Sequence, residues 1–211
     1  MILTTPLAWD KILTLLFIVF NPIKVVGPFV TLTRGTQPAF CRQLAWRAIL
    51  FAAIGVVAAG VLGQRILINW GIQQALLLLA GGIIWFLMAL LTVLQPSFPA
   101  FQPHPSVEVP SLTLALKPLA FPTIVTPYGI ATLIVLMATM QTLGQQGVIL
   151  ALVAIMLLLN WVTMIFAHPI LRLFAIPLEL ISWVLGVLQV TLGLYLISIA
   201  LVNLHVIPTR P

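Results

Sequence analysis

The stretch from Pro118 to Leu171 contains no Asp, Glu, Lys or Arg, and this feature restricts the fold more than any other. About a quarter of the residues in a soluble domain are normally charged. In a bilayer, by contrast, a helix of about 20 apolar residues crosses the hydrocarbon core. The uncharged stretch is long enough for two such crossings. Over the whole chain 62% of residues are hydrophobic and 6% are charged, so we predict an all-α, multi-pass membrane protein.

Apolar segments separated by polar or proline-rich turns predict six transmembrane helices. They cover approximately residues 5–33, 44–68, 73–95, 112–142, 148–166 and 180–204. A loop with five prolines, Pro96–Pro110, divides the chain near its midpoint. We therefore expect one integral membrane domain made of two three-helix repeats, 1–95 and 112–211, joined by a proline-rich loop, 96–111. Because three is odd, two repeats of one fold must be inverted relative to each other in the membrane.

Two of the predicted helices, the first and the fourth, are broken. In the first, Asn21-Pro22 follows a nearly continuous apolar run, and in the fourth, Thr126-Pro127 lies inside the similar segment Pro118–Leu133. Proline lacks an N–H and crowds the carbonyl four residues before it, so neither helix continues unperturbed. Backbone groups freed in lipid need polar partners, and unwound backbone is tolerated only inside protein or at a cavity. The alternative is that each proline only bends a helix to shape packing.

We expect the two breaks to form one binding site near the bilayer midplane, at the interface of the repeats. The half-helix N-termini would present N–H groups to an anion, and Asn21 and Thr126 would add side-chain hydrogen bonds. Gly129 would allow close backbone approach. Lys24 has two interpretations, a partner for a substrate carboxylate or a long side chain that reaches the membrane surface. The candidate substrate-binding residues are Asn21, Pro22, Lys24, Gly27, Thr126, Pro127, Tyr128 and Gly129.

The residues around both breaks resemble signature sequences of the MarC family of bacterial membrane proteins. Three stretches carry the resemblance: FNPIKVVGPFVTLT at the first break, AGGIIWFLMAL in the third helix and PLAFPTIVTPYGIATLIVL at the second break. The resemblance covers nearly the whole chain and implies a six-span protein of the bacterial inner membrane. Some members are classed as transporters of small neutral amino acids, so it also implies a small amino acid as solute. Lys24, Thr126 and Tyr128 stand where the family usually has glycine, which puts the family's substrate preference in doubt here.

Other classes of function have little support in the sequence. It contains no Gly-x-Ser-x-Gly motif and no pair of histidines four apart around a Glu, so we do not expect an enzyme. Cys41 is the only cysteine, and we expect no metal site and no cofactor. The net charge of +6 is not gathered into a basic run, so nucleic acid is not an expected partner. The expected partners are a small-molecule solute and the lipid bilayer, and a homo-oligomer is left open.

The carboxylates bear on the coupling ion. Asp10, Glu108 and Glu179 are the only acids, and all three lie at predicted helix ends. A proton relay through the membrane needs buried ionisable groups. If transport is driven by an ion, we therefore expect Na⁺, held by backbone carbonyls, Asn21 and Thr126.

The basic residues predict the orientation, because Lys and Arg gather on the cytoplasmic side of bacterial membrane proteins. One side holds Arg34, Arg42, Arg47, Lys117 and Arg172, and the other holds Lys11, Arg65 and Arg210. Both termini are therefore expected in the periplasm. A transporter that works by alternating access is the first functional reading. A non-transporting scaffold or sensor, and a channel, are the alternatives, although the sequence has no ring of charge or repeated filter motif.

Two patterns predict how the helices pack. Gly55 and Gly63 lie with Ala59 on one face of the second helix, a spacing that allows close approach of membrane helices. Asn160, Gln189 and Ser198 are polar residues inside apolar helices. We expect these three side chains to hydrogen bond between helices, with the pathway lining as the alternative.

Overall fold

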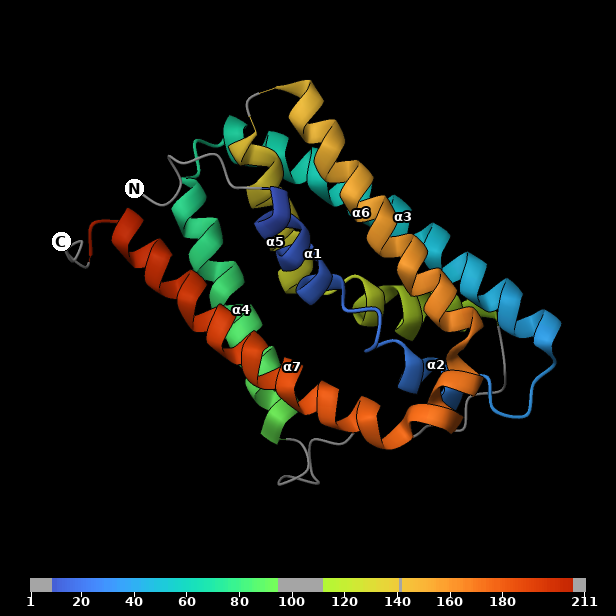
Figure 1. Ribbon diagram of the computed structural model, residues 1–211. Helices are drawn as coiled ribbons and strands as arrows, with labels where there is room; N and C mark the ends of the chain where they lie inside the picture. Colours follow the sequence, from blue (N-terminus) through green and yellow to red (C-terminus); the bar gives the residue numbers. More distant parts are fainter. Residues whose placement is uncertain (1–8, 95–111, 141, 207–211) are drawn as a thin grey trace.

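The computed structural model describes residues 9–94, 112–140 and 142–206, and these residues are helical apart from turns. The helices are α1 (Trp9–Phe20), α2 (Val26–Leu32), α3 (Pro38–Asn69), α4 (Gln74–Leu94), η3 (Leu112–Ala115), η4 (Leu116–Ile124), α5 (Pro127–Thr139), α6 (Leu143–Ile165) and α7 (Ala167–Asn203) (Figure 1). The predicted all-α class is confirmed. The predicted proline-rich loop 96–111 lies outside the described residues.

The described helices differ in whether they are long enough to cross a membrane. Pro38–Asn69, Gln74–Leu94, Leu143–Ile165 and Trp183–Asn203 are long and apolar enough to cross alone. A fifth crossing is available if the bent pair Thr113–Ile124 and Pro127–Thr139, which turns by 63°, counts as one. Helices α1 and α2 have 12 and 7 residues, too few for either to cross alone. Six predicted spans are reached only if α1 and α2 cross together.

The first predicted break is present between α1 and α2. The N–H of Asn21 still donates to the carbonyl of Phe17 at 2.8 Å, which completes the last turn of α1. Asn21 then adopts a positive φ of 24°, a region that asparagine enters more readily than most residues. Its side-chain Oδ1 accepts from the N–H of Ile23 at 3.2 Å, and its carbonyl accepts from the N–H of Lys24 at 3.1 Å. The chain therefore turns out of the helix over residues 21–25.

The second predicted break is present at residues 125–126, between η4 and α5. η4 is a widened, distorted helix in which Lys117 and Phe121 have extended backbone angles. Thr126 is the N-cap of α5, and its Oγ1 accepts from the N–H of Gly129 at 3.2 Å. Pro127 occupies the first helical position, where its missing N–H costs no hydrogen bond. The proline therefore begins the new helix rather than bending an old one.

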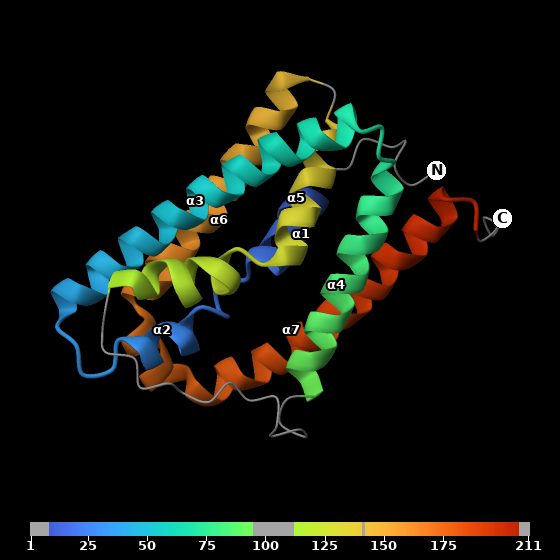
Figure 2. The ribbon, with the colours of Figure 1, turned by 180° about the vertical axis from the view of Figure 1, so that it is seen from behind.

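The two broken segments lie in the middle of the molecule. Helices α1 and α5 run side by side between the pair α3 and α6 on one side and the pair α4 and α7 on the other (Figures 1 and 2). Ile12, Leu16 and Val19 of α1 and Leu133 and Met137 of α5 are among the buried residues of this layer. The outer helices expose large apolar side chains over most of their length, as expected of a surface that faces lipid.

Glycines bring the outer helices close to the centre and to each other. A Cβ atom at Gly60 of α3 would lie 3.1 Å from the side chain of Leu133. Cβ atoms at Gly55 and Gly63 would overlap Phe121 and Ile134. The close packing predicted for this face of the second helix is therefore confirmed, and its partner is the second broken segment.

Helices α4 and α7 pack against each other in antiparallel register. Gly82 lies against Ile197, Phe86 against Gly193 and Val93 against Gly186. Each step forward along α4 is matched by an equal step back along α7. A Cβ atom at Gly193 would lie 2.7 Å from the backbone N of Phe86, so the two backbones meet where no side chain intervenes.

Candidate functional site

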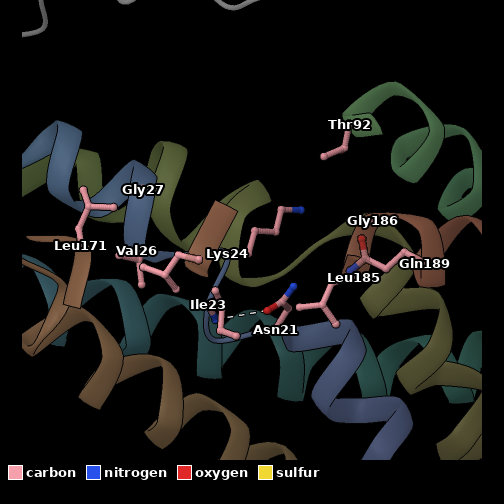
Figure 3. A pocket seen from close by; sticks show the side chains of 11 residues that line it. Asn21, Ile23, Lys24, Val26, Gly27, Thr92, Leu171, Leu185, Gly186 and Gln189 are labelled. Atoms are coloured by element: carbon pink, nitrogen blue, oxygen red, sulfur yellow. Dashed lines mark hydrogen bonds between the residues drawn. The ribbon is translucent and has the colours of Figure 1, made fainter. Parts of the chain in front are cut away.

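A pocket of about 480 Å³ opens beside the first break, and Figure 3 shows the side chains around it. Its volume lies within the range of small-molecule sites. The lining residues are Asn21, Ile23, Lys24, Val26, Gly27, Thr92, Leu171, Leu178, Leu185, Gly186 and Gln189. The break and α2, with Thr92 of α4, come from the first half of the chain, and α7 comes from the second half. The pocket therefore lies at the interface between the two halves.

The structure separates the predicted site residues into three groups. Asn21, Lys24 and Gly27 line the pocket. Tyr128 does not line it, but the Nζ of Lys24 lies 5.9 Å from the centre of the Tyr128 ring. The other four predicted residues are not on the pocket wall, and they are Pro22, Thr126 and Gly129, which are buried, and Pro127, which is exposed.

Lys24, Tyr128 and Trp85 form a stack that joins the two breaks to α4. The Tyr128 and Trp85 rings are parallel, with centroids 5.1 Å apart and an interplanar angle of 6°, and both side chains are buried. An ammonium within about 6 Å of an aromatic ring centre is attracted by the ring's negative face. The side chain of Lys24, in the first break, therefore extends to a residue of the second break. We call these three side chains the Lys24–Tyr128–Trp85 stack.

The stack contains polar atoms that lack protein partners. The Nε1 of Trp85 and the hydroxyl oxygen of Tyr128 are buried and have no hydrogen-bond partner among the described residues. An indole N–H can only donate, and a phenol can donate or accept. Buried groups of this kind cost free energy unless a partner is supplied. A ligand or water with acceptor atoms would satisfy both.

Two amide side chains hold the carbonyls that the first break sets free. The Nε2 of Gln189 donates to the carbonyl of Ile18 at 3.2 Å, which Pro22 cannot bond because it has no N–H. The Nδ2 of Asn160 donates to the carbonyl of Phe20 at 3.3 Å, whose helical partner would have been the N–H of Lys24. The interhelical hydrogen bonds predicted for Asn160 and Gln189 are confirmed, and they tie the first break to α6 and α7.

Ser198 differs from the other two predicted polar residues. Its hydroxyl donates to the carbonyl of Tyr195 at 2.7 Å, within α7, and the bond is exposed. The prediction of an interhelical hydrogen bond for Ser198 is wrong. The sequence could not distinguish it from Gln189, because both lie in the same helix and only the helix rotation separates them.

In each break, a side-chain oxygen accepts a hydrogen bond from a backbone N–H group of the same break. Asn21 Oδ1 and Thr126 Oγ1 accept from the backbone two and three residues ahead, as turn and cap residues do. The N–H groups of Ile23 and Gly129 are therefore already bonded and are not free donors for a ligand. For Asn21 the Nδ2 remains, and Figure 3 shows it on the pocket side, opposite the Oδ1 that faces Ile23.

Among the described residues, no group of three or more His, Cys, Asp or Glu could hold a metal ion. The predicted Na⁺ would therefore depend on neutral oxygens. One buried neutral oxygen, Oδ1 of Asn160, has no partner in this part of the chain. The Na⁺ site stays a prediction.

Sequence reasoning missed the second wall of the pocket. Gln189 was recognised as a buried polar residue, but nothing in the sequence shows that Leu171, Leu185 and Gly186 face the first break across the interface. The stacking of Trp85 on Tyr128 depends on the position of α4 beside α5. These contacts are set by tertiary packing, for which a single sequence carries no local signal.

Sequence comparison finds relatives of the chain among integral membrane proteins. The sequence model described as "MarC family integral membrane protein" matches residues 8–205. The chain is 23% identical to the UPF0056 membrane protein MJ1677 of Methanocaldococcus jannaschii over 184 residues, which cover 86% of this chain and 90% of that protein. No solved structure matches the chain.

Proposed function

The chain belongs to the MarC family of integral membrane proteins, and on that premise we propose that it is a secondary transporter that moves a small solute by alternating access. The observation that carries the proposal is the pocket at the first break, whose walls come from both halves of the chain. A site at the junction of two bundles can face either side of a membrane when one bundle rocks against the other. Broken helices at such a site are typical of transporters.

The pattern of helix contacts supports two inverted three-helix repeats. The pairs α3 with η4 and α3 with α5 in one direction correspond to α6 with α1 and α6 with α2, in that order, in the other, and all four pairs are in contact. The pairs α4 with α7 and α3 with α6 map onto themselves, and α1 with α5 corresponds to η4 with α2, which are also in contact. In this scheme α1 and α2 together form the first span, and η3, η4 and α5 form the fourth. The protein is then a six-span bundle.

The proposed solute is small and carries a carboxylate, the class to which small amino acids belong. Lys24 and the Nδ2 of Asn21 supply a cation and a neutral donor on the wall of the pocket. Pairs of an ammonium with a carboxylate are stronger than hydrogen bonds between neutral groups. The family resemblance points to amino acids of the size of glycine and alanine, which a pocket of this volume admits.

We place the protein in the inner membrane of a bacterium with both termini in the periplasm. The beginning of α1 and the end of α7 lie at the same end of the molecule in both ribbon views (Figures 1 and 2), as an even number of spans requires. The count of Lys and Arg assigns the opposite end, with Arg34, Arg42 and Arg47, to the cytoplasm.

The proposal is tested by filling the pocket. Gly27 lines it, and a Cβ atom there would meet nothing within 4 Å, so Gly27→Trp should occupy the pocket without displacing a neighbour. We expect exchange of small carboxylate solutes in proteoliposomes to fall by at least tenfold, while the thermal stability of the protein is unchanged. Gly147→Trp is the matched control, because a Cβ atom at Gly147 also has open space and the residue is not on the pocket wall.

Three outcomes distinguish the functional classes. Flux that accelerates when unlabelled solute is present on the far side supports a transporter, because only an alternating carrier exchanges in this way. Flux without such acceleration indicates a channel. Absence of flux for every small solute in wild-type proteoliposomes would contradict transport and leave a scaffold or sensor.

A further inference from the structure

We infer that the first break binds a sodium ion on its α6 side, where the Oδ1 of Asn160 and backbone carbonyls freed around the end of α1 supply the oxygen ligands. If the chain transports a solute as proposed above, this ion is the one that drives transport, and this second step alone rests on the proposed function. Three features of the break support the site: an amide oxygen without a donor, carbonyls without donors, and the charge of the helix end.

The first feature is the buried amide of Asn160, which is 0% exposed. Its Nδ2 donates to the carbonyl of Met156 at 2.9 Å and to the carbonyl of Phe20 at 3.3 Å. Because both neighbours are acceptors, the nitrogen must be the atom that faces them, and the two ends of the amide cannot be interchanged. The Oδ1 is then left without a hydrogen-bond partner in the part of the chain that the structure describes. A buried acceptor needs a donor or a cation to offset its lost hydration.

The second feature is a pair of backbone carbonyls that the break sets free. In a continuous helix the carbonyl of Val19 would bond the N–H of Ile23, but that N–H donates to the Oδ1 of Asn21. The carbonyl of Pro22 would bond the N–H of Val26, which donates to the carbonyl of Ile23 instead. Neither carbonyl accepts a hydrogen bond from another described residue. Both residues are buried, so these oxygens also need partners.

The free oxygens belong to one turn of the chain. Val19 and Pro22 flank Phe20, whose carbonyl the Asn160 amide contacts, and the Oδ1 of Asn160 is on the same amide carbon as the nitrogen that makes this contact. The Phe20 carbonyl itself has a second lone pair. Oxygens of the α1 end and of α6 are thus available to the same ion.

The third feature is charge, because the C-terminal end of a helix carries a partial negative charge and α1 ends at Phe20. Unwound carbonyls and the C-terminal ends of half-helices are typical Na⁺ ligands in transporters built from repeats. Amide and carbonyl oxygens are neutral, so they suit a monovalent ion better than Ca²⁺ or Mg²⁺, which usually bind carboxylates. Val19, Phe20 and Asn160 are at most 3% exposed, and tight packing favours Na⁺ over the larger K⁺.

The two side-chain oxygens expected from the sequence are less suitable ligands. Asn21 Oδ1 accepts from the N–H of Ile23, and Thr126 Oγ1 accepts from the N–H of Gly129. In each case the hydrogen already occupies a lone pair that a cation would use. The Oδ1 of Asn160 has no such donor, and it takes their place in the inferred site.

The ion site is distinct from the solute pocket. Helix α1 lies between the pair that contains α6 and the pair that contains α7 (Figures 1 and 2), so Asn160 and Gln189 reach the first break from different sides. Gln189 lines the pocket and Asn160 does not. The Nζ of Lys24, which also lines the pocket, lies over the Tyr128 ring. An ion and a solute can therefore occupy the break together.

Thermal unfolding of the purified protein in detergent tests the site with Na⁺ alone. At equal ionic strength, about 150 mM NaCl should raise the melting temperature by about 3 °C or more over choline chloride, and KCl should raise it far less. The shift should saturate with Na⁺ concentration. Asn160→Leu removes the oxygen and should abolish the shift. Asn160→Asp keeps an oxygen at this position whether its carboxyl is charged or neutral, and it should keep the shift.

Gln189→Leu is the matched control, because it removes the other amide that donates to a carbonyl of α1. Like Asn160→Leu it should lower the melting temperature, but it should retain the Na⁺ shift. Line broadening of the sodium NMR signal gives a second measurement for any variant that does not unfold cooperatively. The wild type, Asn160→Asp and Gln189→Leu should broaden the signal, and Asn160→Leu should not.

Several results would overturn the sodium site. Equal melting temperatures in NaCl and choline chloride, or in NaCl and KCl, would show that no Na⁺-selective site exists. A Na⁺ shift in Asn160→Leu equal to that of the wild type would exclude the Asn160 oxygen. Loss of the shift in Asn160→Asp or in Gln189→Leu would show that the effect follows the general integrity of the break and not this oxygen.

The coupling step is tested separately in proteoliposomes. An inward Na⁺ gradient should accelerate uptake of a small carboxylate solute such as alanine several-fold over an equal K⁺ gradient, and Asn160→Leu should remove this acceleration. Uptake that does not respond to the Na⁺ gradient overturns the coupling and leaves the transport function standing. A Na⁺ shift in the purified protein without flux of any small solute overturns the transport function and leaves the ion site standing.

Discussion

At the first break, side chains supply hydrogen bonds that backbone N–H groups would supply in an unbroken helix. Gln189 and Asn160 donate to the carbonyls of Ile18 and Phe20, which lie in the last turns of α1. In the core of a membrane, a carbonyl without a protein donor has no water to form a hydrogen bond with. The polar residues of α6 and α7 are therefore structural parts of a break in α1.

Replacing Gln189 by Leu should leave the Ile18 carbonyl without a donor. We expect the free energy of unfolding to fall by about 1 kcal/mol, the range measured for hydrogen bonds between membrane helices. Thermal unfolding in detergent measures this. Ser198→Ala is the control, because the hydroxyl of Ser198 bonds within its own helix at an exposed position, and its melting temperature should match that of the wild type. Equal melting temperatures for Gln189→Leu and Ser198→Ala would show that the hydrogen bond from the Gln189 amide does not stabilise the protein.

At the scale of the helices, the breaks were predictable and their partners were not. Pro22 and Pro127 act on the residues next to them, so the sequence alone located both interruptions. The local geometry differs, because Pro127 begins α5 directly after the Thr126 cap whereas residues 21–25 form a turn before α2. The length of α1 and α2 was also not predictable, since hydropathy treats the run as one span.

The two breaks are not chemically equivalent, although they occupy matching places. In the alignment that sets Asn21-Pro22 over Thr126-Pro127, the counterparts of Asn160 and Gln189 are Gly55 and Ile84. Neither can donate a side-chain hydrogen bond. At Gly55 the ring of Phe121 occupies the space instead. The first break is thus held by amides, and the second is packed by an apolar ring.

The contact between α4 and α7 depends on glycine at one point. At Gly193 a Cβ atom would lie 2.7 Å from the backbone N and 2.8 Å from the Cα of Phe86, and backbone atoms cannot move aside as a side chain can. Gly193→Ala should therefore force the helices apart and lower the free energy of unfolding by about 1–3 kcal/mol. Gly144→Ala, at a position with open space, should change the melting temperature little. If Gly193→Ala and Gly144→Ala have the same melting temperature, α4 and α7 do not pack in the register that sets Gly193 against Phe86.

At the scale of the whole molecule, the two halves enclose the pocket from opposite sides. The first half contributes the unwound turn that carries Lys24, and the second contributes α7. A sequence can indicate that each half contains a break, but it cannot show which helix of the second half faces the first break. That choice follows from the antiparallel packing of α4 on α7, which places Gly186 and Gln189 beside residues 21–27.

Alternating access makes a prediction that a static binding protein does not share. Cys41 is the only cysteine, so Cys41→Ser gives a background in which Gly27→Cys places one thiol on the pocket wall. In a transporter this thiol should react with a membrane-impermeant maleimide added from either side, because the pocket opens to each side in turn. Saturating substrate should slow the reaction several-fold from both sides. Gly147→Cys, away from the pocket, should react at a rate that substrate does not change. Labelling of Gly27→Cys from one side alone, with or without substrate, would mean that the pocket opens only to that side, and rocking of the two halves about the pocket would then be excluded.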